Sequence, residues 1–338
     1  MTRRILVVGP AWVGDMVMAQ SLFITLRRQN PDCLIDVLAP GWSLPLIARM
    51  PEVRRGIEMP VIHGEFGFGK LRRLGISLRG ENYDRAIVLP RKLKAALAPW
   101  FARIPRRTGF RGESRYGLIN DMRPLDEGLL AQTVQCFVAL GLEQTPQTRP
   151  IIPEPQLRVD EANRARLRRE LGLSVGQRPA IAFMPGAEYG PAKQWPPEYY
   201  AQLAARLAQA GYQVWVMGSA RESALGESIR AGSGNTAINL CGRTQLVDTV
   251  DLLSLCARAV TNDSGLMHVA AAVGIPLVAI YGSSTPDYTP PLTGRADILY
   301  LRLDCSPCFE RTCPLIHYNC LRHISAETVL AHIPVSTA

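Results

Sequence analysis

The sequence predicts an α/β protein made of two Rossmann-like domains in tandem. Its 338 residues are enough for two domains that each bury a core. Short apolar runs alternate with helical patterns along the chain, as they do in parallel-sheet proteins. A stretch with four prolines, residues 144–155, divides this alternation and is typical of a linker between domains.

Seven apolar runs predict buried parallel strands, because strands covered on both faces carry nearly continuous apolar side chains. These runs are Ile5–Val8, Ile35–Leu38, Arg85–Leu89, Ala180–Met184, Gln213–Met217, Arg258–Thr261 and Leu277–Tyr281. Apolar residues at helical spacing predict helices between them. The expected helices include one from about Met16, and the ranges Glu161–Leu171, Pro197–Ala210 and Leu266–Val273.

The charge of the chain is concentrated in its first half. Residues 1–150 contain 22 Lys and Arg but 13 Asp and Glu, a net charge of +9, whereas residues 151–338 are neutral. A basic half suits an anionic partner, such as a nucleic acid, a membrane surface or an acidic substrate. Zinc-finger spacing, an aromatic RNA-binding strand and a long basic helix are all missing from the sequence, which argues against a nucleic acid partner.

The sequence predicts a reduced, cytoplasmic chain without a membrane anchor. Eight cysteines are too few for a disulfide scaffold. The apolar run at the N-terminus is too short for a signal peptide and is broken by Gly9 and Pro10. The longest low-charge stretch, Gly265–Gly282, includes His268 and Pro276 and is interpreted as a helix and a strand.

Four cysteines near the end of the chain form a cluster in sequence. Cys305, Cys308, Cys313 and Cys320 have the spacing C-x2-C-x4-C-x6-C, with His317 among them. The number suits a structural zinc ion, but the spacing is not a standard zinc pattern. Reduced core thiols and a redox-sensitive pair are equally open, so no metal ligand is assigned.

The segment from Thr261 to Pro286 is the most informative. Asp263, Ser264 and Gly265 precede a helix, where free N–H groups and the helix dipole favour an anion. His268 follows one turn later, and a second polar loop, 282–287, follows the next strand. An ordinary helix cap is the simpler interpretation. Because loops after adjacent parallel strands bind ligands, we predict a site for a phosphorylated small molecule.

The loop after the first strand contains Gly9, Gly14 and Asp15. It fails the phosphate-loop pattern, since Asp15 stands where a lysine is needed, and it fails the dinucleotide pattern as well. A carboxylate at the carboxyl end of a strand suits a general base that takes a proton from a hydroxyl. A simple helix-capping role for Asp15 is about as well supported by the spacing.

Two further loops follow strands of the second domain. In the first, 185–196, Gly186 allows a bend and Lys193 is placed to reach a phosphate, although a single loop lysine is usually a solvated charge. In the second, 218–222, Glu222 suits a ribose hydroxyl or, equally, the N-terminus of a helix.

Basic residues gather in the loops that follow the predicted strand Arg85–Leu89 of the first domain. They are Arg91, Lys92, Lys94, Arg106, Arg107, Arg111 and Arg115. Guanidinium groups bind phosphate and carboxylate in bidentate fashion. Most basic runs are solvated faces, but these account for much of the excess charge, so we predict an anionic acceptor.

Three motifs together resemble glycosyltransferase family 9, the ADP-heptose:lipopolysaccharide heptosyltransferases. They are Val13–Met16, Pro185–Pro196 and Thr261–His268, within a resemblance that runs from about residue 4 to 330. The amino-acid sequences of these motifs are most similar to those of the family members that add the second inner-core heptose.

The resemblance implies a GT-B fold, in which two Rossmann-like domains face each other across a cleft. Residues 1–150 would bind the acceptor, residues 151–325 the nucleotide sugar, and a helix in 326–338 would pack back on the first domain. It also implies an inverting, metal-independent reaction without a cofactor. L-glycero-D-manno-heptose would move from ADP-heptose to the first heptose of the anionic lipopolysaccharide inner core, at the inner face of the inner membrane.

The resemblance also implies site residues. Asp15 matches the catalytic base. The predicted donor-binding residues are Gly186, Lys193, Glu222, Asp263, Ser264, Gly265 and His268, and the predicted acceptor-binding residues are Lys94, Arg107, Arg111 and Arg115. Similar sequences have Asn where this chain has Arg91.

Other functions remain open at this point. A GT-B transferase that uses another nucleotide sugar, such as a UDP-sugar, and the heptosyltransferase that adds the first heptose are the closest alternatives. A nucleotide-binding interaction protein without activity is a third. A nicotinamide dehydrogenase is disfavoured because no Gly-x-Gly-x-x-Gly follows a strand.

Overall fold

A computed structural model of the chain describes residues 3–62, 64–173, 176 and 178–334. Contacts divide the chain into two compact units, Met1–Pro155 and Gln156–Ala338. The boundary falls at the end of the proline-rich stretch that was expected to be a linker. None of the helices in the described ranges is both long and apolar enough to cross a membrane.

The first unit contains a parallel sheet of six strands in the order β3-β2-β1-β4-β5-β6. The strands are β1 (Arg4–Val8), β2 (Leu34–Ala39), β3 (Val53–Glu58), β4 (Arg85–Val88), β5 (Arg106–Phe110) and β6 (Asp121–Arg123). The helices are α1 (Val13–Gln29), α2 (Leu44–Ile47), α3 (Phe68–Ser77), α4 (Leu97–Phe101) and α5 (Thr133–Gly141). The chain reverses its direction across the sheet between β1 and β4, which is where open α/β sheets bind ligands.

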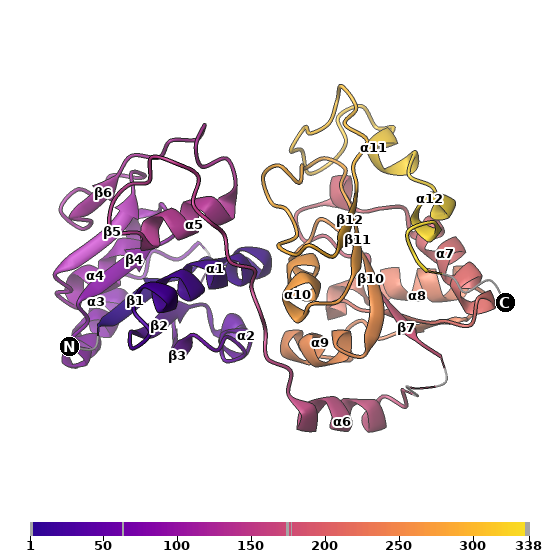
Figure 1. The fold of residues 1–338 in the computed structure, drawn as a ribbon, viewed down its shortest axis with the longest axis horizontal. Helices are drawn as coiled ribbons and strands as arrows, with labels where there is room; N and C mark the ends of the chain where they lie inside the picture. The colour runs from indigo at the N-terminus through magenta and orange to yellow at the C-terminus, as the bar shows by residue number, and fades with distance from the viewer. Residues whose placement is uncertain (1–2, 63, 174–175, 177, 335–338) are drawn as a thin grey trace. The chain divides into compact units, whose positions relative to one another are not determined.

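The second unit repeats this topology with the order β12-β11-β10-β7-β8-β9. The strands are β7 (Ala180–Met184), β8 (Gln213–Val216), β9 (Ala237–Asn239), β10 (Cys256–Asn262), β11 (Leu277–Ile280) and β12 (Ala296–Leu299). The helices are α6 (Glu161–Glu170), α7 (Pro197–Gln209), α8 (Ser223–Gly232), α9 (Leu246–Leu253), α10 (Gly265–Val273), α11 (Asn319–Arg322) and α12 (Ala326–Leu330). Figure 1 shows α7 and α8 on one face of this sheet and α9 and α10 on the other. Its switch point lies between β7 and β10.

All seven predicted strands are present, with ends that differ from the expected ones by at most two residues. The predicted helices α6, α7 and α10 are confirmed as well. The strands β3, β5, β6, β9 and β12 were not predicted, and four of these five form the outer edges of the two sheets. Edge strands are covered less completely, so they need no continuous apolar run.

Helix α1 begins earlier than expected, at Val13 instead of Met16. The Met16 amide donates to the carbonyl of Trp12 over 2.9 Å, which closes the first turn ahead of the predicted start. Asp15 therefore lies in the first helical turn and not in the preceding loop. A carboxylate there interacts favourably with the helix dipole.

The end of the described chain packs within the second unit. Helix α12 contacts α7, and its Val329, followed by Ile333, joins the apolar core around Trp195 and Tyr200. The rings of Trp195 and Tyr200 meet edge to face with their centroids 4.7 Å apart. The expected packing of residues 326–338 on the first domain stays a prediction, and residues 335–338 lie outside the described ranges.

Candidate functional site

The loops that follow β7 and β10 meet at the switch point of the second sheet. Asn262, the last residue of β10, holds them together through its buried side chain. Its Oδ1 accepts hydrogen bonds from the Trp195 amide and the Tyr200 hydroxyl, both over 3.1 Å. Its Nδ2 donates to the carbonyl of Pro185 over 2.5 Å. The loop 185–196 is thereby fixed against the start of α10.

An ion pair lies at this junction. Lys193 ends a short 3-10 turn, Pro191–Lys193, and its Nζ lies 2.5 Å from Oδ2 of Asp263. The Ser284 hydroxyl donates to the same carboxylate oxygen over 2.5 Å. The side chain of Asp263 is 5% exposed and that of Lys193 is 18% exposed, so the pair is largely removed from water. The sequence predicted that Lys193 and Asp263 share a site, and the structure brings them into contact.

The N-terminus of α10 lies beside this pair. Ser264 occupies the N-cap position, yet its side chain makes no capping hydrogen bond. Three buried polar atoms in this region have no hydrogen-bond partner: Ser264 Oγ, Ser283 Oγ and His268 Nδ1. Buried polar atoms in proteins almost always have partners. Together with the free N–H groups that begin at Gly265, they indicate a binding site for an anionic or polar ligand.

His268 is neutral at physiological pH. Its pKa is lowered to about 4, mainly by burial; the negative charge of Asp263 opposes this shift and the positive charge of Lys193 adds to it. The imidazole is 4% exposed. His268 therefore cannot supply positive charge to a phosphate, although its ring can still donate or accept a hydrogen bond.

Gly186 and Glu222 form a second contact at this edge of the sheet. A Cβ on Gly186 would lie 1.8 Å from Oε1 of Glu222, so a larger residue at 186 would displace this carboxylate. Oε2 of Glu222 accepts from the Ser219 amide over 2.5 Å and closes a capping box at the turn Ala220–Glu222. The helix-terminal role considered for Glu222 is therefore present.

The segment after β12 contacts the loops that follow β7 and β11. Arg311 stacks on the ring of Tyr189, with its Cζ 5.5 Å from the ring centre, and Lys193 Nζ lies 5.1 Å from that centre. The Phe309 amide donates to the carbonyl of Ser283 over 2.7 Å. Gly190 has a φ of +155°, and a Cβ there would come within 2.4 Å of the Arg311 carbonyl oxygen.

In the first unit, Asp15 and Lys94 flank the corresponding switch point. Asp15 follows β1 and is half-buried in the first turn of α1. Lys94 follows β4, and its Nζ donates to the carbonyl of Glu65 over 2.9 Å. The loop with Arg111 adjoins it, because the Glu113 amide donates to the Arg91 carbonyl over 3.1 Å. Arg111 itself is exposed.

Arg107 and Arg115, whose acceptor-binding role stays a prediction, make hydrogen bonds within the first unit. Their guanidinium groups donate to main-chain carbonyls. Arg107 lies in β5 and donates to the carbonyls of Leu118 and Gly117 over 2.6 and 3.2 Å. Arg115 is 1% exposed and donates to the carbonyls of Pro90 and Phe110. Arginine offers five donors, which suits it to hold such loops in place.

Sequence reasoning did not single out Asn262, Ser284 or Arg311. Both lie within the segment that was identified as most informative: Asn262 is the last residue of β10, and Ser284 lies in the loop that follows β11. A rule that examines every polar residue at the carboxyl end of a strand finds both of them. Nothing near Arg311 in the sequence indicates that it contacts Tyr189, more than a hundred residues away.

The chain is similar to known proteins over most of its length. The family model for glycosyltransferase family 9 (heptosyltransferase) matches residues 71–319. The lipopolysaccharide heptosyltransferase 2 of Escherichia coli K12 is 50% identical over 307 residues, which cover 88% of each chain. The lipooligosaccharide heptosyltransferase 2 of Haemophilus influenzae is 49% identical over 309 residues, again 88% of each chain.

The fold agrees with a solved structure as well. The E. coli ADP-heptose lipopolysaccharide heptosyltransferase II superimposes with a TM-score of 0.85 at 44% identity, over 97% of both chains. The predicted GT-B class is confirmed by this match and by the two parallel sheets. From its motifs, its fold and its relatives, the chain belongs to glycosyltransferase family 9, the heptosyltransferases.

Proposed function

We propose that this enzyme transfers L-glycero-D-manno-heptose from ADP-heptose to the first heptose of the lipopolysaccharide inner core. The observation that carries the donor half of the proposal is the Lys193–Asp263 pair at the N-terminus of α10, surrounded by buried polar atoms without partners. A diphosphate would satisfy the free N–H groups and draw on the charge of Lys193. The names of the close relatives support heptose as the sugar.

In the proposed reaction, the acceptor hydroxyl attacks the anomeric carbon and ADP leaves, which inverts the configuration at that carbon. Asp15 takes the proton of the hydroxyl as the new glycosidic bond forms. Lys193 and the α10 N-terminus neutralise the charge that develops on the departing diphosphate, so the chain's own groups perform the part that a metal plays elsewhere. Asp263 orients Lys193, and one of its oxygens is available to the sugar.

Within the donor site, we assign the adenosine to the edge formed by Gly186 and Glu222. The absence of a side chain at Gly186 leaves the backbone open to close approach. Oε1 of Glu222 would accept a ribose hydroxyl while Oε2 keeps its bond to the Ser219 amide. Ser264, Gly265 and neutral His268 complete the site as hydrogen-bonding groups.

For the acceptor we retain Lys94 and Arg111 as the binding residues. Residues 1–150 carry the whole net positive charge of the chain, which suits an anionic inner core. Large apolar side chains are exposed after the same ends of its strands, among them Ile62 at 76%, Phe66 at 51% and Tyr116 at 69%. An apolar and basic face supports an acceptor held at the cytoplasmic surface of a membrane.

Product analysis tests the proposal. The full chain is incubated with ADP-heptose and purified lipopolysaccharide that carries only the first heptose, and the product is measured by mass spectrometry. We expect the mass to rise by one heptose residue, with no reaction on an acceptor that lacks heptose. ADP should inhibit the reaction and UDP should not. Transfer only to the heptose-free acceptor, or inhibition only by UDP, would refute the assignment.

A further inference from the structure

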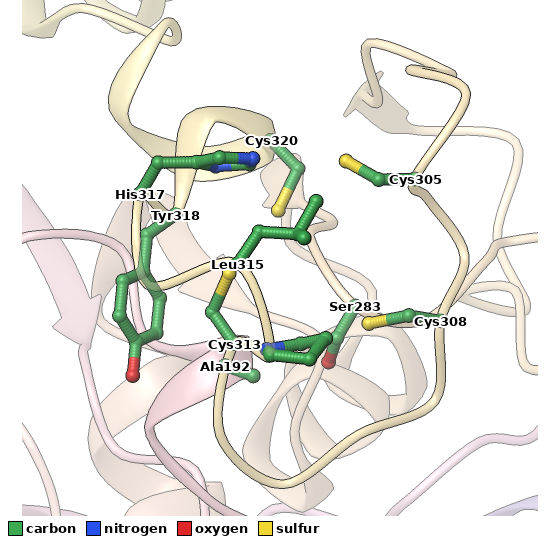
Figure 2. A pocket seen from close by; sticks show the side chains of 10 residues that line it. Ala192, Ser283, Cys305, Cys308, Cys313, Leu315, His317, Tyr318 and Cys320 are labelled. Carbon is green, nitrogen blue, oxygen red and sulfur yellow. The ribbon is translucent and has the colours of Figure 1, made fainter.

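The four cysteines near the end of the chain line one small cavity, and Figure 2 shows their side chains around it. They are Cys305, Cys308, Cys313 and Cys320. In the ranges that the structure describes, no group of three or more His, Cys, Asp or Glu is placed so that it could hold a metal ion. These thiols therefore support no metal site. A contact between two loops of the first unit is more informative.

Glu113, in the loop after β5, holds the loop after β4. Its Oε2 accepts a hydrogen bond from the Leu93 amide over 2.7 Å, and its Oε1 lies 2.9 Å from Nζ of Lys92. The main-chain amide of Glu113 donates to the Arg91 carbonyl over 3.1 Å. One residue thus contacts three consecutive residues of the neighbouring loop, and we call this set of contacts the Glu113 clasp.

The residues on either side of Glu113 bring the two loops equally close. A Cβ on Gly112 would lie 2.4 Å from the Arg91 carbonyl oxygen, so the backbones meet without room for a side chain. The buried guanidinium of Arg115 donates to the carbonyls of Pro90 and Phe110. The first of these carbonyls follows β4 and the second ends β5. The loops are therefore joined at two points, one buried and one exposed.

The clasp also fixes the start of the helical segment that carries Lys94. Lys92 is the N-cap residue of the 3-10 turn Leu93–Ala96, but its side chain makes no capping hydrogen bond. The first N–H groups of a helical segment have no partner within it. Glu113 supplies that partner to Leu93 from another loop. It thereby sets the backbone position from which the side chain of Lys94 extends.

Neither stability nor charge explains an acid at this place. The side chains of Glu113 and Lys92 are 47% and 70% exposed, and ion pairs so exposed contribute little to stability. The hydrogen bond from the Leu93 amide, followed by the bond from Lys92, lowers the pKa of Glu113. Glu113 is therefore negatively charged at neutral pH and opposes the binding of an anion to this basic face. A role through geometry fits better than a role through charge.

We propose that Glu113 is a positioning residue for the acceptor, which acts through the loop after β4 and not by contact with the acceptor. This inference rests on the function proposed above, in which Lys94 binds the acceptor. The Leu89 amide donates to the Val8 carbonyl over 3.1 Å, so this loop leaves the sheet beside the end of β1. Asp15 follows the same strand end. An ordered loop thus holds Lys94 in a constant position relative to the start of α1.

Two substitutions of Glu113 separate geometry from charge. E113A removes the clasp and the negative charge, whereas E113Q removes the charge but keeps an oxygen that can accept from the Leu93 amide. We expect E113A to raise the acceptor KM roughly tenfold, although the face becomes more positive, because the loop loses its fixed position. E113Q should stay within about twofold of the wild-type value or fall below it. The KM for ADP-heptose should change by less than about twofold in both variants.

The control and the contrary outcome follow from the same reasoning. E127A removes an equal charge from an exposed acid of the first unit, and its acceptor KM should stay within about twofold of the wild-type value. Charge alone predicts an equal or lower acceptor KM in E113A, because a repulsive group is lost. That result would overturn the proposal. So would an equal rise in E113A and E113Q.

Hydrogen exchange of the free protein tests the clasp without any substrate. In E113A the amides of residues 91–96 should exchange roughly tenfold faster than in the wild type, and in E113Q they should not. G112A, which forces the loops apart at the same contact, should also speed their exchange. Wild-type exchange in both E113A and G112A would refute the clasp. A wild-type chain that transfers no heptose would refute the proposed function instead, and the exchange rates would still decide whether Glu113 orders the loop.

Discussion

The two units share one topology but present very different chemistry at their switch points. In the second unit, the loops after β7 and β10 join Lys193 to Asp263 in a pair that is mostly buried. In the first unit, the loops after β1 and β4 carry Asp15 and Lys94, which are half-buried and lie near exposed aromatic side chains. The same scaffold therefore holds a closed, polar site in one unit and an open, basic and apolar face in the other.

This difference shows how the burial of charged groups determines the kind of ligand that each unit suits. A buried ion pair is strongly oriented, because the low local dielectric makes each charge sensitive to its partner. Such a site suits a small ligand whose charge must be matched in a fixed geometry. An exposed basic face attracts anions over longer distances, and salt weakens this attraction by screening the charges. It suits a large anionic acceptor, for which contact area matters more than any single hydrogen bond.

Replacing Asp15 should have the largest effect. We expect D15N to lower kcat by about 1,000-fold, because an amide cannot accept the proton of the acceptor hydroxyl. ADP binding, measured by calorimetry, should stay within about threefold of the wild-type value, since the donor residues lie in the other unit. The exposed acid Asp32 provides the matched control, and D32N should keep normal turnover. Near-normal transfer by D15N would leave Asp15 as a helix-terminal acid only.

Removal of the Lys193 charge should have the next largest effect. We expect K193A to lower kcat/KM by about 300-fold, because the leaving diphosphate loses a preorganised cation. The exposed Arg221, which pairs with Glu188 on the surface of the same unit, is the control, and R221A should change little.

A double variant separates two causes of the K193A defect. In K193A the buried carboxylate of Asp263 loses its partner, which by itself is destabilising. K193A/D263N removes that unpaired charge. If Lys193 acts on the diphosphate, the double variant should recover thermal stability but not turnover. Recovery of both would show that Lys193 serves only to neutralise Asp263.

The buried imidazole of His268 should make the second unit sensitive to acid. Its folded pKa of about 4 is lower than the unperturbed value of 6.5, so between these values the unfolded chain binds more protons than the folded one. Stability is therefore complete above pH 6.5 and is lost as the pH falls, by about 3 kcal/mol at pH 4. Denaturant unfolding between pH 4 and 7 measures this slope. H268Q should flatten it and H323Q, at an exposed histidine, should not. Equal slopes in wild type and H268Q would contradict the assignment.

The sequence was sufficient to predict the central strands of both sheets but not their edge strands. Central strands such as β1 and β7 are covered by helices on both faces, so their apolar runs are continuous. Edge strands such as β3 carry Arg54 and Arg55 side by side, because part of each edge strand faces water. Hydrophobic pattern therefore cannot distinguish such a strand from a loop.

The site divides in a similar way. The residues of the Lys193–Asp263 pair follow strands and belong to recognisable motifs, so spacing and resemblance together predicted them. The role of an arginine is harder to predict, because its side chain is long and its guanidinium group can donate hydrogen bonds to a carbonyl as well as to a phosphate. Arg115 and Arg111 are four residues apart, yet one is buried on main-chain carbonyls and the other is exposed. Only the folded loop determines which of the two can meet a ligand.

The smallest effect is expected on the open face, where contacts are shared among several groups. We expect K94A and R111A each to raise the KM for the acceptor by roughly tenfold, as the loss of one exposed charge-assisted contact would. The KM for ADP-heptose should change less than twofold. R72A, which removes an equal charge from the exposed side of α3, is the control. The acceptor KM of the wild-type enzyme should also rise with salt, and less steeply in R111A, because fewer charges remain to be screened. An unchanged acceptor KM in both variants would mean that the basic face acts only through its net charge.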